Sequence, residues 1–361
     1  MKKQFSTPVV LLLAAAIGMA SCKKHNDAQA PQNDNADGQL LAAFLQSNGP
    51  SFQSFSVDAA AGGTVTTTKG TKFIIPADIF VTASGAPVTG AVSFSVKEIK
   101  DVSDMILGDK PTLTSDGQML VSYGEYFTKA SQNNQDLKIK KDSAIKVQVQ
   151  AKPNNGGNGQ DIPIWSGDST ITTTLNGYNY QNTPTTVTIQ TAVNTGVVWN
   201  QKAASYSFFN SSNGSLDFKL DSLMKWVNCD GLYNLPGTKT TVMGYFATHF
   251  NSQTSTNYSG EQPTMLFFKP TGQKTVAKFY NVIMNAPAGY EGLHSYQASI
   301  VIGQQGTFLA MSVKDGKFYA DMKDVTIGTP AGSNNYTTVT FNPQEVTESA
   351  MLALVNQMNS K

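Results

Sequence analysis

The chain from residue 52 onward is a series of short β-branched and partly alternating apolar segments separated by turns that contain glycine. The clearest segments are residues 64–68, 71–75, 91–96 and 145–149, with Gly62-Gly63, Lys69-Gly70, Ser84-Gly85 and Asp116-Gly117 between such runs. Short strands with frequent turns are typical of β-sandwiches and not of parallel sheets with crossover helices. We therefore expect a mainly β protein whose first β-sandwich domain covers residues 52–150.

Segments of the same kind continue through the rest of the chain. In residues 151–224 they are 169–174, 185–190 and 205–209, and after Trp226 they are 240–248, 264–268, 275–279, 297–302, 307–313, 317–320 and 336–341. The first group forms a β-rich connecting region, which either completes the first domain or leads to a second one. The second group is sufficient for a second β-sandwich over residues 225–343. About 310 ordered residues also favour two domains over one.

Two segments have helical periodicity instead. Leu40, Leu41, Phe44 and Leu45 precede Asn48-Gly49-Pro50, which predicts a short N-terminal helix that ends there. Near the other end, Asn342 is placed as an N-cap, Pro343 as the first helical residue and Glu345 as the third. The apolar stripe of this second helix is Val346, Ala350, Met351, Leu354, Val355 and Met358. We expect an amphipathic helix over residues 344–361 that covers the second sandwich or docks a partner.

The first residues of the chain match the pattern of a lipoprotein signal peptide. Lys2 and Lys3 precede an apolar run over residues 9–19, and Met19-Ala20-Ser21-Cys22 follows. Because this run has only about 11 residues, it is too short to span a membrane, which takes about 20. We expect residues 1–21 to be removed and Cys22 to be lipidated, with residues 22–51 forming a flexible tether and the short helix. No aspartate follows Cys22 directly, which favours the outer membrane, on its periplasmic or external side.

The charge balance is close to neutral. All 26 basic residues are lysines, and loss of Lys2 and Lys3 leaves 24 lysines against 25 acidic residues. Arginine is the residue that binds phosphate and carboxylate in bidentate fashion. Its absence and the neutral balance give no indication of a nucleic-acid or other polyanionic partner.

Little in the chain indicates catalysis or a cofactor. Cys229 has no second cysteine to pair with once Cys22 is lipidated, and we expect it to be a buried apolar residue. The three histidines form no zinc or nucleophile motif. Asp101, Asp104 and Asp116 are weak metal candidates, which solvated surface carboxylates explain better. Four glutamates could serve a glycosidase, but the sequence cannot pair them: Glu98, Glu125, Glu261 and Glu291.

Aromatic residues near Asn and Gly in predicted loops are the best candidates for a ligand surface. They are Trp165, Tyr178, Tyr180, Tyr258 and Tyr290. Planar rings beside small polar residues suit the binding of sugars or peptides, although such rings also fill β cores. We expect a non-catalytic binding or structural module for a glycan, a peptide or an envelope protein. The alternative is an envelope hydrolase whose site is assembled from distant carboxylates.

One stretch of the chain resembles known families. Gly62-Gly63-Thr64-Val65, residues 70–77 and Val88-Thr89-Gly90-Ala91-Val92 are similar to the β-sandwich domain shared by ankyrins, netrin receptors and zonula occludens proteins. Residues 55–150 also resemble the first domain of Bacteroidetes-type lipoproteins of uncertain function, which carry stretches like Lys97-Glu98-Ile99, residues 104–107 and residues 120–127. Both resemblances imply a β-sandwich, and the second one implies a lipid anchor.

Overall fold

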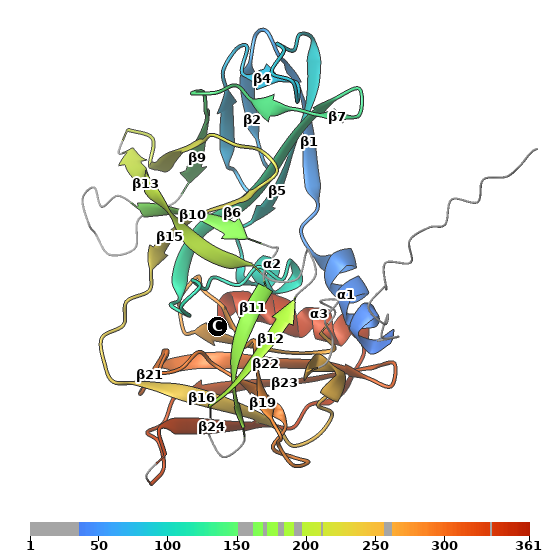
Figure 1. The fold of residues 1–361 in the computed structure, drawn as a ribbon, viewed down its shortest axis with the longest axis vertical. Coiled ribbons are helices and arrows are strands. Elements are labelled where there is room, and N and C mark those ends of the chain that lie inside the picture. The colour runs from blue at the N-terminus through green and yellow to red at the C-terminus, as the bar shows by residue number, and fades with distance from the viewer. Residues whose placement is uncertain are drawn as a thin grey trace, which may run out of the picture. The chain divides into compact units, whose positions relative to one another are not determined.

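The structure is a computed structural model that describes residues 36–150, 162–168, 172–179, 184–190, 197–210, 212–255, 262–332 and 334–361. These residues belong to one compact unit, Asn35–Lys361. As the alternating segments predict, the described chain is mainly β, with several sheets and few helices (Figure 1). Among the described residues, no helix combines the length and the hydrophobicity needed to cross a membrane.

The largest sheet has eleven described strands. In spatial order, the path runs through β1 (Phe52–Asp58), β5 (Ala91–Ile99), β6 (Leu120–Gln132), β15 (Trp226–Leu232), β10 (Ile162–Asp168), β13 (Val198–Asn210), β14 (Ser215–Leu220), β9 (Ile145–Gln150), β3 (Lys72–Ile75) and β2 (Gly63–Thr66), and β7 (Gln135–Asp136) pairs with β6. Every pairing along this path is antiparallel. A two-stranded pair, β4 (Phe80–Val81) and β8 (Lys138–Ile139), lies nearby in the sequence.

The two ends of this sheet pack against each other. Phe94 of β5 and Tyr126 of β6 share one apolar cluster with Phe73 of β3, Val147 of β9 and Phe218 of β14. The ring centroids of Phe73 and Tyr126 are 5.7 Å apart, in an edge-on arrangement. Alternate residues of a strand point to opposite sides of the sheet. The other residues of β5 and β6 therefore lie on the face turned away from this cluster, which we call the outer face.

Two further sheets follow. One contains β12 (Pro184–Gln190), β11 (Thr172–Asn179), β19 (Asn281–Met284), β20 (Gly292–His294), β16 (Lys239–Phe246) and β21 (Ile300–Val301), with β24 (Tyr336–Phe341) parallel to β16. The other contains β18 (Ala277–Lys278), β17 (Thr264–Pro270), β22 (Gln305–Lys314), β23 (Lys317–Thr326) and β25 (Gln344–Val346).

Strand β17 is buried on both of its faces. Every residue of β17 is buried, and successive side chains enter different apolar clusters. Leu266 and Phe268 pack with Phe341 of β24, while Met265 and Phe267 pack with residues of the three helices. A strand covered on both sides has no polar face, which explains why residues 264–268 form an almost continuous apolar run.

The helices are α1 (Ala36–Asn48), α2 (Val102–Leu107) and α3 (Glu348–Gln357), and 3-10 turns cover Ser252–Ser255 and Met358–Ser360. Figure 1 shows the three helices next to one another beside β22 and β23, and their apolar residues share one cluster. The prediction for α1 is confirmed, because Leu41, Phe44 and Leu45 are buried and the helix ends at Asn48. Asp37 ties this helix to the β22–β23 turn by accepting hydrogen bonds from the backbone N–H groups of Asp315 and Gly316.

The C-terminal helix begins later than residue 344. Residues Gln344–Val346 extend along β23 as strand β25, and Thr347 is the N-cap, whose hydroxyl accepts a hydrogen bond from the N–H of Ala350 at 3.2 Å. Pairing with β23 supplies hydrogen bonds that an isolated first turn would lack, so the tertiary contact overrides the local capping signal at Asn342. The predicted apolar stripe still faces inward, since Met351, Val355 and Met358 are fully buried.

The predicted boundary at residue 225 also differs from the sheet topology. Trp226–Leu232 is β15, which lies between β6 and β10 in the first sheet. The connecting region is divided between sheets: β10 and β13 join the first one, while β11 and β12 pair with β19 in another. Strand pairing between residues far apart in sequence leaves no local signal, so the sequence alone does not show which sheet β15 joins.

Candidate functional site

The outer face of the first sheet brings charged, hydroxyl and aromatic side chains from several strands together. Three rows of directly opposed residues cross it. The middle row contains Phe52, Lys97, Phe127 and Trp226. The row on one side of it contains Ser54, Ser95 and Lys129. The row on the other side contains Ile99, Glu125, Asn228 and Trp165. Opposed residues in antiparallel strands point to the same side, so the side chains of all three rows share this face.

One end of the outer face, which we call the open end, consists of Phe52, Ser54, Ser95, Lys97 and Lys129. Phe52 and Ser54 are exposed there, Lys97 and Lys129 are half-buried, and Ser95 is buried. Phe52 is 39% exposed, and the Nζ atoms of Lys97 and Lys129 lie 5.1 and 4.4 Å from the centroid of its ring. Both distances fall within the range of cation–π attraction. The aromatic contacts continue along the row from Phe52 to Phe127 at 6.1 Å and from Phe127 to Trp226 at 5.5 Å.

The other end, which we call the covered end, contains two fully buried carboxylates. They are Glu125 on β6 and Asp230 on β15. Between these strands a bulge shifts the register, so that Ser122 lies opposite Asp230 while Glu125 lies opposite Asn228. Asn228 donates a hydrogen bond to Asp230 Oδ2. Among the described residues, three carboxylate oxygens at this end have no hydrogen-bond partner: Glu125 Oε1, Glu125 Oε2 and Asp230 Oδ1.

Residues beyond the first sheet cover this end. Lys110, which follows α2, is buried with its Nζ 5.4 Å from the ring centroid of Trp226. The neighbouring Asp109 accepts hydrogen bonds from Lys278 Nζ at 2.8 and 3.0 Å, and both partners of this ion pair are buried. The N–H of Ser122 also donates to the carbonyl of Lys274. The covered end is therefore closed by the segment after α2 and by the region of β18.

Burial determines the protonation of these groups. It raises the pKa of Glu125 well above the usual range, and repulsion from Asp230 adds to that shift. Burial likewise raises the pKa of Asp230 to about 7, although hydrogen bonds from Ser122 and Asn228 oppose the change. Burial lowers the pKa of Lys110 to about 8, against the attraction of Asp109 and Glu125. At the open end, partial burial lowers the pKa of Lys97, and repulsion from Lys129 lowers it further.

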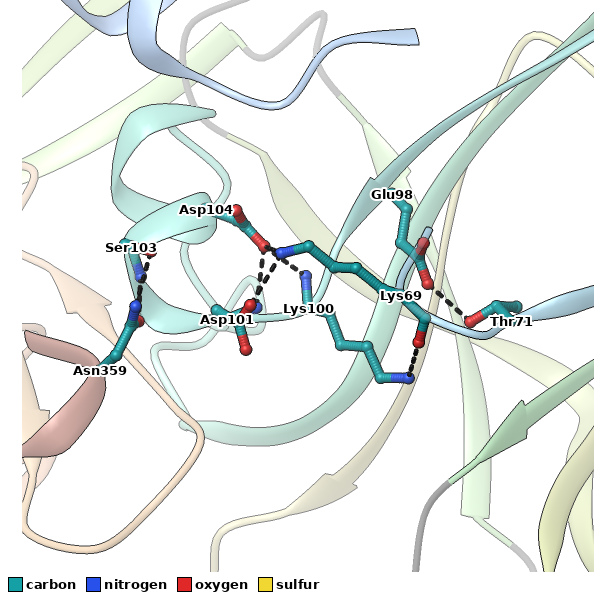
Figure 2. A network of polar contacts seen from close by, with 8 residues as sticks. All are labelled: Lys69, Thr71, Glu98, Lys100, Asp101, Ser103, Asp104 and Asn359. Atoms are coloured by element: carbon teal, nitrogen blue, oxygen red, sulfur yellow. Dashed lines mark hydrogen bonds and ion pairs between the residues drawn. The ribbon is translucent and has the colours of Figure 1, made fainter. Parts of the chain in front are cut away.

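The predicted metal candidates Asp101 and Asp104 serve a different arrangement. The two residues form a capping box at the start of α2, in which the N–H groups of Lys100 and Asp101 both donate to Asp104 Oδ2 at 3.0 Å. Figure 2 shows Lys69 reaching from the β2–β3 turn to both carboxylates, with 2.8 Å between its Nζ and Asp101 Oδ2. The site therefore holds a lysine ammonium group, which links the turn to the helix.

Other polar contacts in this network extend the same connection. Thr71 donates a hydrogen bond to Glu98 Oε1 at 2.6 Å, and Ser103 and Asn359 join α2 to the last 3-10 turn through two hydrogen bonds (Figure 2). The third metal candidate, Asp116, lies in a turn where it accepts hydrogen bonds from the side chains of Thr114 and Gln118. Within the part of the chain that the structure describes, no group of three or more Asp, Glu, His or Cys residues is placed to hold a metal ion.

Of the predicted ligand-surface aromatics, the two whose side chains the structure describes, Trp165 and Tyr290, lie near different sheets. Trp165 is only 4% exposed, and its indole N–H donates to the carbonyl of Asp230 at 2.9 Å, so it belongs to the covered end and not to an open surface. Tyr290 is 52% exposed and packs edge-on against Tyr245, away from the first sheet. Tyr178 lies on β11, and Tyr180 and Tyr258 lie outside the described residues.

Cys229 and the described histidines are held in structural contacts. Cys229 is fully buried with its Sγ 3.4 Å from Ser207 Oγ, and burial raises the pKa of its thiol to about 12. His294 is buried with Nδ1 2.7 Å from the carbonyl oxygen of Ser295, and burial lowers its pKa to about 4. His249 stacks on Tyr319. A thiol that stays protonated at neutral pH is a poor nucleophile.

Sequence reasoning missed the residues of the outer face as a group. The single available signal was Glu125, a carboxylate in the middle of the apolar stretch that became β6. The pairing of Phe52 with Lys97 and Lys129 depends on the register of three strands, and no local pattern specifies that register. Comparisons with protein families, with curated proteins and with solved structures found no match to this chain.

Proposed function

We propose that this protein is a lipoprotein of the bacterial envelope that works as a non-catalytic binding module. In this proposal lipid on Cys22 holds it at the outer membrane, and its sheets form two β-sandwich domains that present a surface to the periplasm or the exterior. The ligand is a glycan, a peptide or another envelope protein. The pattern of Lys2, Lys3 and residues 9–22 supports the anchor.

The open end of the outer face is the observation that carries the binding proposal. It combines an exposed aromatic ring, two lysines and several serine hydroxyls on the rigid strands β1, β5 and β6. Sites built on strands hold their geometry better than sites on loops. Exposed aromatic rings next to hydrogen-bonding groups are typical of surfaces that bind sugars and peptides.

The hydrolase alternative has less support. A glycosidase needs two carboxylates that reach opposite sides of the scissile bond. Glu125 and Asp230 are neighbours on the outer face, but both are fully buried beneath Lys110 and the residues around it. A substrate does not reach these two groups without displacing their cover.

The anchor is tested by changing the residue that carries it. Replacing Cys22 with Ala should move the protein from the membrane fraction to the soluble fraction, because no acyl chain can then be attached. The control is Cys229→Ala, which removes the buried cysteine and should leave the protein in the membrane fraction. Membrane retention of the Cys22→Ala variant would contradict the proposed anchor.

Binding is tested with the full chain in detergent, on an array of glycans and peptides. Phe52→Ala should lower the affinity for the ligand by about tenfold, because a stacked ring contributes on the order of 1 kcal/mol to binding. Phe208 is a matched control, since it is also an exposed phenylalanine, 53% accessible, on strand β13. Equal losses for Phe52→Ala and Phe208→Ala, or binding that neither change affects, would show that the open end is not the ligand surface.

A further inference from the structure

Two lysines at the open end are brought together without a counter-charge. Lys97 and Lys129 lie in neighbouring rows of adjacent strands, and both ammonium groups lie against the ring of Phe52. Among the described residues, neither lysine forms an ion pair, although lysines elsewhere do: Lys69, Lys146, Lys202, Lys278, Lys317 and Lys361. Within the described part of the chain, Lys97 and Lys129 therefore share one aromatic ring without a carboxylate to neutralise either charge.

The two like charges repel each other, and the structure maintains them close together. Repulsion by Lys129 adds to the effect of partial burial in lowering the pKa of Lys97. The Phe52 ring compensates in part, because the negative face of an aromatic ring attracts both ammonium groups. An anion bound between them would remove the remaining repulsion and would make two charge-assisted hydrogen bonds.

A hydroxyl donor lies beside the lysines. Ser95 is directly opposite Lys129, Ser54 is opposite Ser95, and the two hydroxyl oxygens are 2.8 Å apart. Ser54 is exposed and Ser95 is buried, so when Ser95 donates to Ser54, the hydrogen of the Ser54 hydroxyl remains able to bond a ligand. Ser56 and Ser93 continue this row of hydroxyls along the exposed strand pair.

We propose that Lys97, Lys129 and the Ser54–Ser95 pair form a binding site for the anionic groups of an acidic glycan. This inference rests on the proposed binding function and specifies its ligand class. The lysines would bind a carboxylate, sulfate or phosphate substituent, and the row of serines would bond sugar hydroxyls. Charge complementarity selects an anion, while serine hydroxyls beside a single exposed ring suit a polysaccharide better than a lipid bilayer. The neutral overall charge gave no reason to expect this, because it averages over a local concentration of positive charge.

The test uses the full chain in detergent and isothermal titration calorimetry with two probes. Polygalacturonate carries a carboxylate on each sugar, and neutral dextran carries none. The wild-type protein should bind polygalacturonate more tightly than dextran, and the double variant Lys97→Met, Lys129→Met should lose about tenfold in affinity, as expected for two partly exposed charge pairs. Lys219→Met, which removes an exposed lysine on β14, should bind as the wild type does. All variants should have unchanged unfolding midpoints.

The outcomes separate this inference from the proposed function. Equal binding of both polymers that depends on Phe52 but not on the lysines would overturn the anion site and keep the binding surface. Unchanged polygalacturonate affinity in the double variant would likewise overturn it. Lysine-dependent binding to phosphatidylglycerol vesicles, with no polygalacturonate binding, would replace the glycan with lipid phosphate. If Lys219→Met weakened the binding of polygalacturonate as much as the double variant does, the attraction would be nonspecific and the anion site would be overturned.

Discussion

The open end and the covered end of the outer face each bring two like-charged side chains together, but they differ in exposure to water. At the open end, Lys97 and Lys129 remain unpaired beside an exposed ring, where water solvates part of each charge. At the covered end, Glu125 and Asp230 are also close to a like charge, but water does not reach them. The first arrangement leaves both ammonium groups within reach of water, whereas burial makes the carboxyl groups of the second favour their protonated forms. Burial, and not residue type, decides which cluster can contact a ligand.

The cover that makes this difference comes from elsewhere in the chain. Asp109 and Lys110 follow α2, and Lys278 ends β18 in another sheet. The buried ion pair between Asp109 and Lys278 and the contact of Lys110 with Trp226 close the covered end. Predictions at the covered end therefore concern stability, while those at the open end concern charge and binding.

The largest expected effect follows from breaking the buried ion pair. Asp109→Asn should lower the free energy of unfolding by about 3–5 kcal/mol, because the ammonium group of Lys278 then stays buried without a counter-charge. Asparagine also tolerates the left-handed backbone of Asp109, with φ of 47°. Urea denaturation followed by circular dichroism measures the change.

A surface pair of equal length provides the control for this measurement. Lys317 Nζ and Glu345 Oε2 are 2.8 Å apart, as are Lys278 Nζ and Asp109 Oδ1, but the side chains of the surface pair are 56% and 57% exposed against 1% and 6%. Glu345→Gln should change the free energy of unfolding far less than Asp109→Asn does, because water already solvates both charges of the surface pair. Similar losses for the two variants would contradict the role assigned to burial.

The second prediction concerns pH. The pKa of Asp230 is about 7 in the folded protein and 3.8 in its ordinary state, so the folded form retains a proton that the unfolded form releases in this window. The contribution of Asp230 to the free energy of unfolding should therefore be most favourable below about pH 4. This contribution should fall by up to about 4 kcal/mol as the pH rises to about 7. Glu125 should act in the same direction, since its pKa is also raised.

Chemical denaturation at several pH values isolates this contribution through a variant. Asp230→Asn resembles the protonated carboxyl group in shape and does not titrate. Its stability should depend less steeply on pH between about 4 and 7 than that of the wild type. A parallel dependence in both proteins would mean that Asp230 does not retain its proton in the folded state.

The smallest expected effect lies at the open end. Lys129→Met should raise the pKa of Lys97, because the repulsion that adds to the effect of partial burial is removed. The free energy of unfolding should change by no more than about 0.5 kcal/mol, as is usual for surface positions. Titration of the lysine side-chain resonances by NMR measures this shift. Lys219→Met is the control and should leave Lys97 unaffected; a shift of equal size there would remove the argument that Lys129 acts on Lys97 directly.

Local sequence signals predicted elements well where neighbours in sequence decide the structure. The spacing of Leu41, Phe44 and Leu45 together with Gly49 specified α1, and glycine turns between alternating segments specified the mainly β class. The C-terminal helix was predicted to begin too early. Its capping signal at Asn342 was sound by local rules, but pairing of residues 344–346 with β23 took precedence.

Pairings between distant strands determined what the sequence left open. The insertion of β15 between β6 and β10 places Asn228 and Asp230 beside Glu125, although about 100 residues separate them along the chain. The same principle gathers Phe52, Lys97 and Lys129 at the open end. A register shift of one residue would move these side chains to the opposite face.

The sequence by itself determined the β-rich class, the short first helix, the apolar stripe of the last one and a single cysteine buried as an apolar residue. Its residue types also indicated little catalytic equipment. Only the tertiary structure decided which charges meet, because strand register and burial depend on contacts between distant segments. Near-neutral composition therefore concealed two opposite clusters: two lysines in contact with water, and two carboxylates whose burial favours their neutral forms.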